Sequence, residues 1–229
     1  MPATPSGYLF LLGFAAGLAV LALTAYRRIT PLWLRAALIA TALFMMGRYV
    51  TLAAFASVRD PQSVWILRHF WFASSVALTF PSVFAVDQLL RHPKMTPRKL
   101  LIGYSPFLAV YASLILFGQF RAVPDRITGW TLELESFWPL LVSIVQSVFV
   151  LLFVGASVLF LLKVPMRAVR VALALLAFSH LWMAFDGALL ALGGWYFRPF
   201  LFSEMAMLAS LWYAYETAYA LQHSAFSLS

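Results

Sequence analysis

Seven long apolar runs constrain the fold of this chain more than any other feature. Hydrophobic residues make up 63% of the sequence and charged residues only 10%, whereas soluble domains are about 45–50% apolar and about 25% charged. About 20 mostly apolar residues in a helix cross the hydrocarbon core of a bilayer, and each run has about that length. The sequence therefore predicts an all-α membrane protein, a single seven-helix transmembrane bundle over residues 1–229 with helices at 8–26, 31–55, 64–90, 100–120, 137–163, 168–195 and 199–222.

The basic residues of the short connections predict how this bundle is oriented. One set of alternate connections carries Arg27, Arg28, Arg91, Lys94, Arg98, Lys99, Lys163, Arg167 and Arg170. The other set carries fewer basic residues and all the acidic loop residues, namely Arg59, Arg121, Arg126, Arg198, Asp60, Asp125, Glu133 and Glu135. Cytoplasmic loops carry the excess of Lys and Arg. We therefore expect the N-terminus outside and the C-terminus in the cytoplasm, with the first run kept as a spanning helix because no basic segment precedes it.

Ionisable residues on four of the predicted helices fall at one depth. The helical rise of about 1.5 Å per residue converts sequence position into height, and it places the following residues in one layer toward the outer face, with His180 about two turns deeper: Arg48, Arg68, His69, Asp186 and Glu204. A lone charge in the membrane costs a few kcal/mol or more. The two arginines and two carboxylates are therefore expected to neutralise one another, with Asp186 meeting Arg48 or Arg68.

Two interpretations of this predicted layer stay open. The charges form either a closed network that holds the helices in register, or the lining of an outward-facing cavity that binds a polar or zwitterionic molecule or moves protons. A second polar group lies near the cytoplasmic ends of the third and seventh helices. There Asp87 and Glu216 are expected to be solvated or to lie within reach of Arg91.

Several cofactor chemistries lack the residues they need. The lysines Lys94, Lys99 and Lys163 all lie at the predicted cytoplasmic side, so no lysine of the seventh helix could form a retinal Schiff base. His69 and His180 lie at different depths, which disfavours a bis-histidine haem. The sequence contains no cysteine, no zinc-ligand spacing and no nucleophile–base pair. We therefore expect no cofactor and no enzyme activity, and we assign the positive charge to membrane orientation and not to nucleic-acid binding.

The stretch from Trp33 to Gly118 carries a pattern of aromatic residues and prolines. It reads "WLRAALIATALFMMGRYVTLAAFA", then "WILRHFWFASSVALTFPSVFAVDQLLRH", then "KLLIGYSPFLAVYASLILFG". The third helix carries Pro81 and is followed by the basic loop "RHPKMTPRK", and the fourth carries Pro106. This pattern resembles the N-terminal seven-transmembrane sensor region of certain bacterial histidine kinases, as does "GWTLELESFWPLL" before the fifth helix.

The resemblance implies a receptor-like sensor in the bacterial cytoplasmic membrane that passes a signal from outside or from within the membrane to a cytoplasmic output domain. No output domain follows the seventh helix in this sequence, so a protein partner is expected to supply the output function. Two alternatives stay open: an accessory subunit of a larger membrane complex, and a small-solute transporter. The small-residue pattern "GFAAG", with Gly13 and Gly17, is typical of helix contacts within a bundle or in a homodimer.

The predicted layer gives a first test. We expect Asp186→Asn to lower the thermal stability of the protein in detergent or to abolish any ligand binding, because it would leave an arginine without its counter-charge. Wild-type stability with undiminished binding would contradict the predicted pairing of Asp186 with Arg48 or Arg68.

Overall fold

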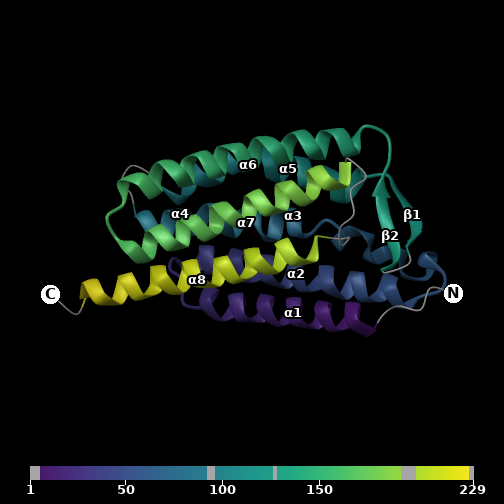
Figure 1. Ribbon diagram of the computed structural model, residues 1–229, viewed down its shortest axis with the longest axis horizontal. Helices are drawn as coiled ribbons and strands as arrows, with labels where there is room; N and C mark the ends of the chain where they lie inside the picture. The colour runs from purple at the N-terminus through teal and green to yellow at the C-terminus, as the bar shows by residue number, and fades with distance from the viewer. Residues whose placement is uncertain (1–5, 92–95, 126–127, 192–199, 227–229) are drawn as a thin grey trace.

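The computed structural model describes residues 6–91, 96–125, 128–191 and 200–226, which are mostly helical. Figure 1 shows the long helices lying side by side along one axis. The elements are α1 (Ser6–Tyr26), α2 (Leu32–Ser57), the 3₁₀ helix η1 (Pro61–Phe70), α3 (Ser74–Ala77), α4 (Thr79–Leu90), α5 (Pro97–Phe117), β1 (Phe120–Asp125), β2 (Gly129–Leu134), α6 (Trp138–Lys163), α7 (Arg167–Ala191) and α8 (Leu201–Phe226).

Six helical segments of the described chain are long and apolar enough to cross a membrane. They are 7–26, 32–57, 61–90, 97–117, 138–163 and 167–189, and they correspond to the first six predicted runs. The last helix, α8, has 26 residues and is thus as long as α2, but it carries more polar side chains. The structure therefore agrees with an integral membrane protein, and the count of seven spans stays a prediction.

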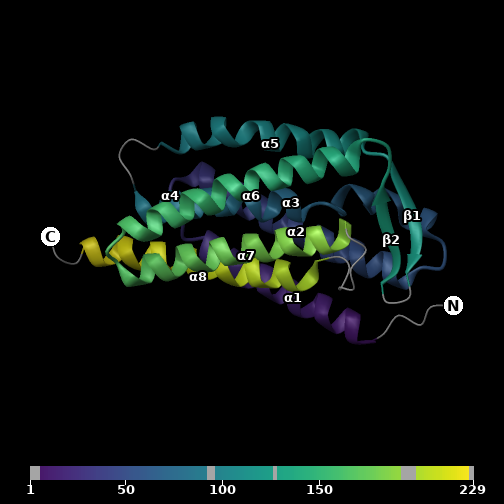
Figure 2. The same cartoon turned by 45° about the horizontal axis from the view of Figure 1, so that its top comes forward.

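The helices pack in an order that follows the sequence and then closes on itself. Helix α1 packs against α2, α5 against α6, α6 against α7 and α7 against α8, and α8 returns to contact α1. Helix α4 contacts α2, α5, α7 and α8, so it lies among the others. Figures 1 and 2 show this arrangement, with α1 and α5 at opposite sides of the bundle. As a result, α8 touches helices from both halves of the chain.

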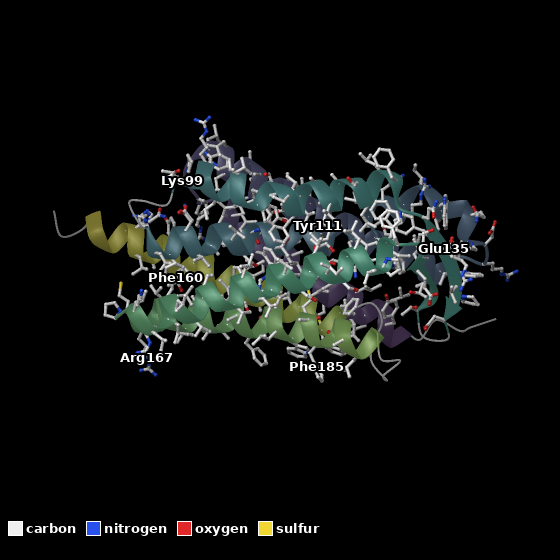
Figure 3. The ribbon with its side chains drawn as sticks, turned by 90° about the horizontal axis from the view of Figure 1, so that it is seen from above. Lys99, Tyr111, Glu135, Phe160, Arg167 and Phe185 are labelled. Carbon is white, nitrogen blue, oxygen red and sulfur yellow. The ribbon has the colours of Figure 1, made fainter. Side chains whose placement is uncertain are left out.

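The two ends of the bundle differ in charge. The hairpin of β1 and β2 lies at the same end as the start of α1, and α8 finishes at the opposite end (Figure 1). In Figure 3, Lys99 and Arg167 lie at the end away from the hairpin, whereas Glu135 lies beside the hairpin. We call these the basic end and the hairpin end. Their charges follow the asymmetry from which the orientation was predicted.

The predicted third helix is not continuous. Residues 64–90 were expected to form one α-helix, but the segment is divided into η1, α3 and α4, and Val64 has non-helical angles (φ −118°, ψ 16°). Pro81 explains one break, because its ring clashes with the carbonyl group four residues earlier, at Ala77. Helix α3 ends at that residue and α4 begins at Thr79. A 3₁₀ helix rises about 2.0 Å per residue, so the α-helical rise from which the depths of Arg68 and His69 were predicted does not apply to η1.

The segment between α5 and α6 forms an antiparallel β-hairpin, so the all-α prediction was wrong in this part. Its register pairs Phe120 with Leu134 and Asp125 with Gly129. The hairpin packs on the end of α2, where the Trp130 indole donates a hydrogen bond to the Val58 carbonyl (3.2 Å). An isolated two-stranded hairpin is at best marginally stable, so this packing is what holds the hairpin over the bundle.

Alanines, and not the predicted glycine pair, bring α1 close to its neighbours. The buried stripe of α1 contains Ala15, Ala19 and Ala22, which are three or four residues apart and therefore share one face. Gly13 and Gly17 are exposed, and a Cβ atom added at either would meet no atom within 4 Å. The described bundle therefore does not use the glycine pair, and its role in a homodimer stays a prediction.

The hairpin's contact with α2 depends on Gly129. Its φ is +75°, and an added Cβ would lie 2.9 Å from both the Cα and the carbonyl oxygen of Ala56. We expect Gly129→Ala to destabilise the protein by at least about 1–2 kcal/mol, the usual cost of a left-handed conformation for an L-residue. Thermal unfolding in detergent measures this. The control is Gly155→Ala in α6, where an added Cβ meets no atom within 4 Å and the helix should gain stability; equal effects of the two substitutions would contradict the prediction.

Candidate functional site

The candidate site is centred on a buried ion pair between α2 and α8. The Arg48 Nε and Glu204 Oε1 atoms are 2.8 Å apart, and a second Arg48 nitrogen lies 2.7 Å from the same oxygen. The side chains are only 3% and 1% exposed. Two charges that are removed from water in this way are retained only when they pair closely, and here the guanidinium and the carboxylate provide that pairing directly.

Helical periodicity places the side chains of Arg48 and Glu204 in the interior of the bundle. In α2, Arg48 follows the buried Met45 by three residues and precedes the buried Leu52 by four. In α8, Glu204 follows the buried Leu201 by three residues and precedes the buried Leu208 by four. Residues three or four apart share one face of a helix. Each charged residue therefore occupies a position on an otherwise apolar buried stripe, and the two stripes meet in the bundle.

Three polar atoms around the pair have no hydrogen-bond partner among the described residues. They are the Glu204 Oε2 atom and the hydroxyl groups of Tyr8 and Tyr49. Tyr8 in α1 is 4% exposed and Tyr49 in α2 is 3% exposed, and both interact electrostatically with Arg48 and Glu204. The Ser74 side chain also interacts with the Glu204 carboxylate. A buried polar atom that lacks a partner costs about 1–3 kcal/mol, so this group of atoms needs an explanation.

Asp186 lies beside the pair but does not form it. Its half-buried side chain on α7 interacts with the side chains of Ser203 and Trp182. It also interacts electrostatically with the Glu204 carboxyl group. The predicted partner of Asp186 was Arg48 or Arg68, whereas the structure gives Arg48 to Glu204. Asp186 and Glu204 were predicted to lie at one level, and the two side chains do interact electrostatically. Depth alone could not decide which of the two carboxylates meets the arginine.

Arg68 and His69, in η1, make contacts outside this cluster. An Arg68 nitrogen donates a hydrogen bond to the Trp65 carbonyl (3.4 Å), and the guanidinium carbon lies 5.4 Å from the centre of the Trp65 ring. The His69 Nδ1 atom is 2.8 Å from the carbonyl oxygen of Ile115 in α5. The predicted layer is therefore reduced to Arg48, Glu204 and the adjacent Asp186.

His180 lies in the aromatic core between α6 and α7. Its ring stacks on Phe153 with centroids 4.2 Å apart, and its Nδ1 atom is 2.9 Å from the Leu176 carbonyl oxygen. The ring is fully buried, and its Nε2 atom has no hydrogen-bond partner among the described residues. A search of the same residues finds no group of three or more His, Asp or Glu side chains that could hold a metal ion.

At the basic end, Glu216 has a partner that was not predicted, whereas Asp87 contacts Arg91 through the backbone. Glu216 in α8 forms an ion pair with Arg28, whose nitrogen lies 3.0 Å and 3.1 Å from the two carboxylate oxygens. The Arg28 guanidinium also lies 5.3 Å from the centre of the Tyr219 ring. Asp87 is half-buried, and its carbonyl accepts a hydrogen bond from the backbone N–H of the exposed Arg91 (2.8 Å).

Tyr8 and Tyr49 were not among the site residues predicted from the sequence. Tyr8 lies two residues from the start of α1, where a tyrosine is ordinarily taken for an anchor at the membrane interface. Tyr49 follows Arg48 directly, and this "RY" pair was the one signal that could have identified it.

No protein-family model, curated protein or solved structure matches the chain.

The ion pair gives a prediction that separates Glu204 from Asp186. Glu204→Gln should destabilise the protein by about 3–5 kcal/mol, because it removes the buried carboxylate with which Arg48 pairs. Asp186→Asn should cost clearly less, since Arg48 keeps its partner. The free energy of unfolding, measured by denaturant titration in detergent, compares the two.

A double variant controls for the loss of packing in this comparison. Arg48→Met combined with Glu204→Met removes both charges and should recover most of the stability lost in Glu204→Gln. If Asp186→Asn proved as destabilising as Glu204→Gln, the assignment of the arginine to Glu204 would be contradicted.

Proposed function

We propose that the chain is a receptor-like membrane sensor that binds a small polar ligand at the Arg48–Glu204 pair and signals through a partner protein. It crosses the membrane seven times, with the hairpin end outside and the basic end in the cytoplasm. The observation that carries this proposal is a group of three buried polar atoms that have no hydrogen-bond partner among the described residues. They are Glu204 Oε2 and the hydroxyls of Tyr8 and Tyr49, which interact electrostatically with the ion pair. A purely structural network would be expected to satisfy its own members.

The charge asymmetry of the two ends supports the orientation. The described connections at the basic end carry exposed or half-buried Arg28, Arg91, Lys99 and Arg167, and such residues face the cytoplasm in most membrane proteins. The binding groups then lie in the outer half of the bundle, beneath the hairpin that packs on α2.

Helix α8 supports the signalling part of the proposal. It carries Glu204 near its hairpin end and Glu216, which binds Arg28, near its basic end. These residues are 12 positions apart, or about 18 Å along a helix. A ligand shifts a conformational equilibrium only if it binds one state more tightly, and a ligand that engages Glu204 acts directly on the helix that reaches the basic end.

Native mass spectrometry of the protein, extracted gently from its own membranes, tests the binding site. A monomer or homodimer that carries a discrete small mass is expected, and this mass should be lost in the Arg48→Met, Glu204→Met double variant. A stoichiometric assembly with other proteins and no bound small molecule would favour an accessory subunit instead. Flux of the retained molecule into proteoliposomes would favour a transporter.

Spin-label distances test the predicted movement of α8. Because the sequence contains no cysteine, labels can be attached at Met166→Cys, at the turn between α6 and α7, and at the exposed Ala220→Cys in α8. We expect the distance between them to shift when the retained molecule is added back to stripped protein. The same labels in the Arg48→Met, Glu204→Met background should show no shift; a wild-type distance that does not respond would contradict signalling through α8.

A further inference from the structure

The three atoms near the ion pair that have no partner among the described residues can all accept a hydrogen bond. Glu204 Oε1 accepts both hydrogen bonds from Arg48, which leaves Oε2 available as a carboxylate acceptor. The phenol oxygens of Tyr8 and Tyr49 also accept hydrogen bonds, and each hydroxyl can rotate its own hydrogen away. These three oxygens come from three different helices, α8, α1 and α2, and α1 packs against both of the others.

The charges of the cluster favour a cation. Arg48 and Glu204 neutralise each other, and Asp186 adds a second carboxylate that interacts electrostatically with Glu204. Among the described residues Asp186 forms no ion pair within 4.0 Å; its polar contacts are with Ser203 and Trp182. With both carboxyl groups ionised, these three side chains would sum to one negative charge, which is costly inside a membrane unless a proton or another positive charge neutralises it.

A primary ammonium group matches both properties. It carries one positive charge and three N–H donors, and the described residues of the cluster offer three acceptor oxygens and two carboxyl groups against one arginine. An anion would be repelled by the two carboxylates. A quaternary ammonium group has the charge but no N–H to donate to Oε2 or to the phenols.

We propose that the site takes the primary ammonium group of a small amine, held by Glu204 Oε2 and the hydroxyl oxygens of Tyr8 and Tyr49, with Asp186 balancing its charge. This inference rests on the proposed function and names the chemical class of its ligand. The amine comes from the hairpin end, where Tyr8 stands near the start of α1.

Thermal unfolding of the full chain in detergent tests the proposal with methylammonium chloride as the probe. Methylammonium chloride replaces sodium chloride step by step at constant ionic strength. Tetramethylammonium chloride is the matched control salt, because its cation has no N–H donor. Methylammonium should raise the wild-type unfolding midpoint in a saturable way, by about 5–11 °C at about 100 times its dissociation constant. Tetramethylammonium should leave the midpoint unchanged.

Two tyrosine variants separate the site from a general effect of the probe. The Tyr8→Phe, Tyr49→Phe double variant keeps both rings and removes only hydroxyls that lack partners, so it should fold, unfold at or above the wild-type temperature without probe, and lose the methylammonium shift. Tyr26→Phe is the matched control. Its hydroxyl is also buried without a partner among the described residues, but it lies at the last residue of α1, at the basic end, so this variant should keep the full shift.

Equal shifts from methylammonium and tetramethylammonium, or a methylammonium shift that survives in the Tyr8→Phe, Tyr49→Phe variant, would overturn the ammonium site. The contrast between the two cations is made on wild-type protein and does not depend on how any variant folds. The same unfolding measurement with a panel of uncharged and zwitterionic molecules distinguishes failure of the ammonium proposal from failure of the proposed function. If one of these shifts the wild type and not the double variant, the polar site stands and the ammonium class is wrong; if none does and methylammonium also fails, the proposed function fails with it.

Discussion

The ion pair between Arg48 and Glu204 is the interaction on which the arrangement of the hairpin end depends. It joins residues 156 positions apart and so ties the second helix of the chain to the last. Helix α1 packs against both helices, and the pair therefore also fixes where α1 can lie. A buried ion pair adds little net stability, because desolvation offsets the attraction, but breaking it is costly. Its main effect is to exclude other registers of α2 and α8, in which either charge would be buried alone.

Helix α8 makes further polar contacts along its length. The side chains that make these contacts are the reason why it is the least apolar of the long helices. Below Glu204 it contacts two other helices and the turn after α1 through side-chain hydrogen bonds or ion pairs: Ser210 with Ser179 in α7, Tyr215 with the Pro81 carbonyl in α4, Gln222 with Gln88 in α4, and Glu216 with Arg28 in the turn. Each contact uses a polar group that hydrocarbon would not solvate. Helix α8 is thus held by directional bonds at several heights, whereas α5 and α6 expose much of their apolar surface.

Much of the helical framework could be predicted from the sequence, because the length of an apolar run is a local property. The expected run 137–163 compares with α6 at Trp138–Lys163, and 31–55 with α2 at Leu32–Ser57. The prediction of one continuous helix at 64–90 was wrong, because Pro81 interrupts backbone hydrogen bonding within an apolar run that looks continuous. The hairpin was not predicted, since its strands are short and form only where Trp130 and Gly129 can pack on α2.

The sequence by itself determined that the chain needs an apolar solvent, where most of its helices lie and which end is basic, and it predicted similar depths for Arg48, Asp186 and Glu204. These features depend on composition and on the rise of a helix. Only the tertiary structure decided that Glu204 and not Asp186 meets Arg48, that Tyr8 and Tyr49 interact electrostatically with this pair, and that Glu216 binds Arg28. Such choices depend on how each helix is rotated and on which neighbour it faces, and a repeat of three to four residues along one helix carries no information about its neighbours.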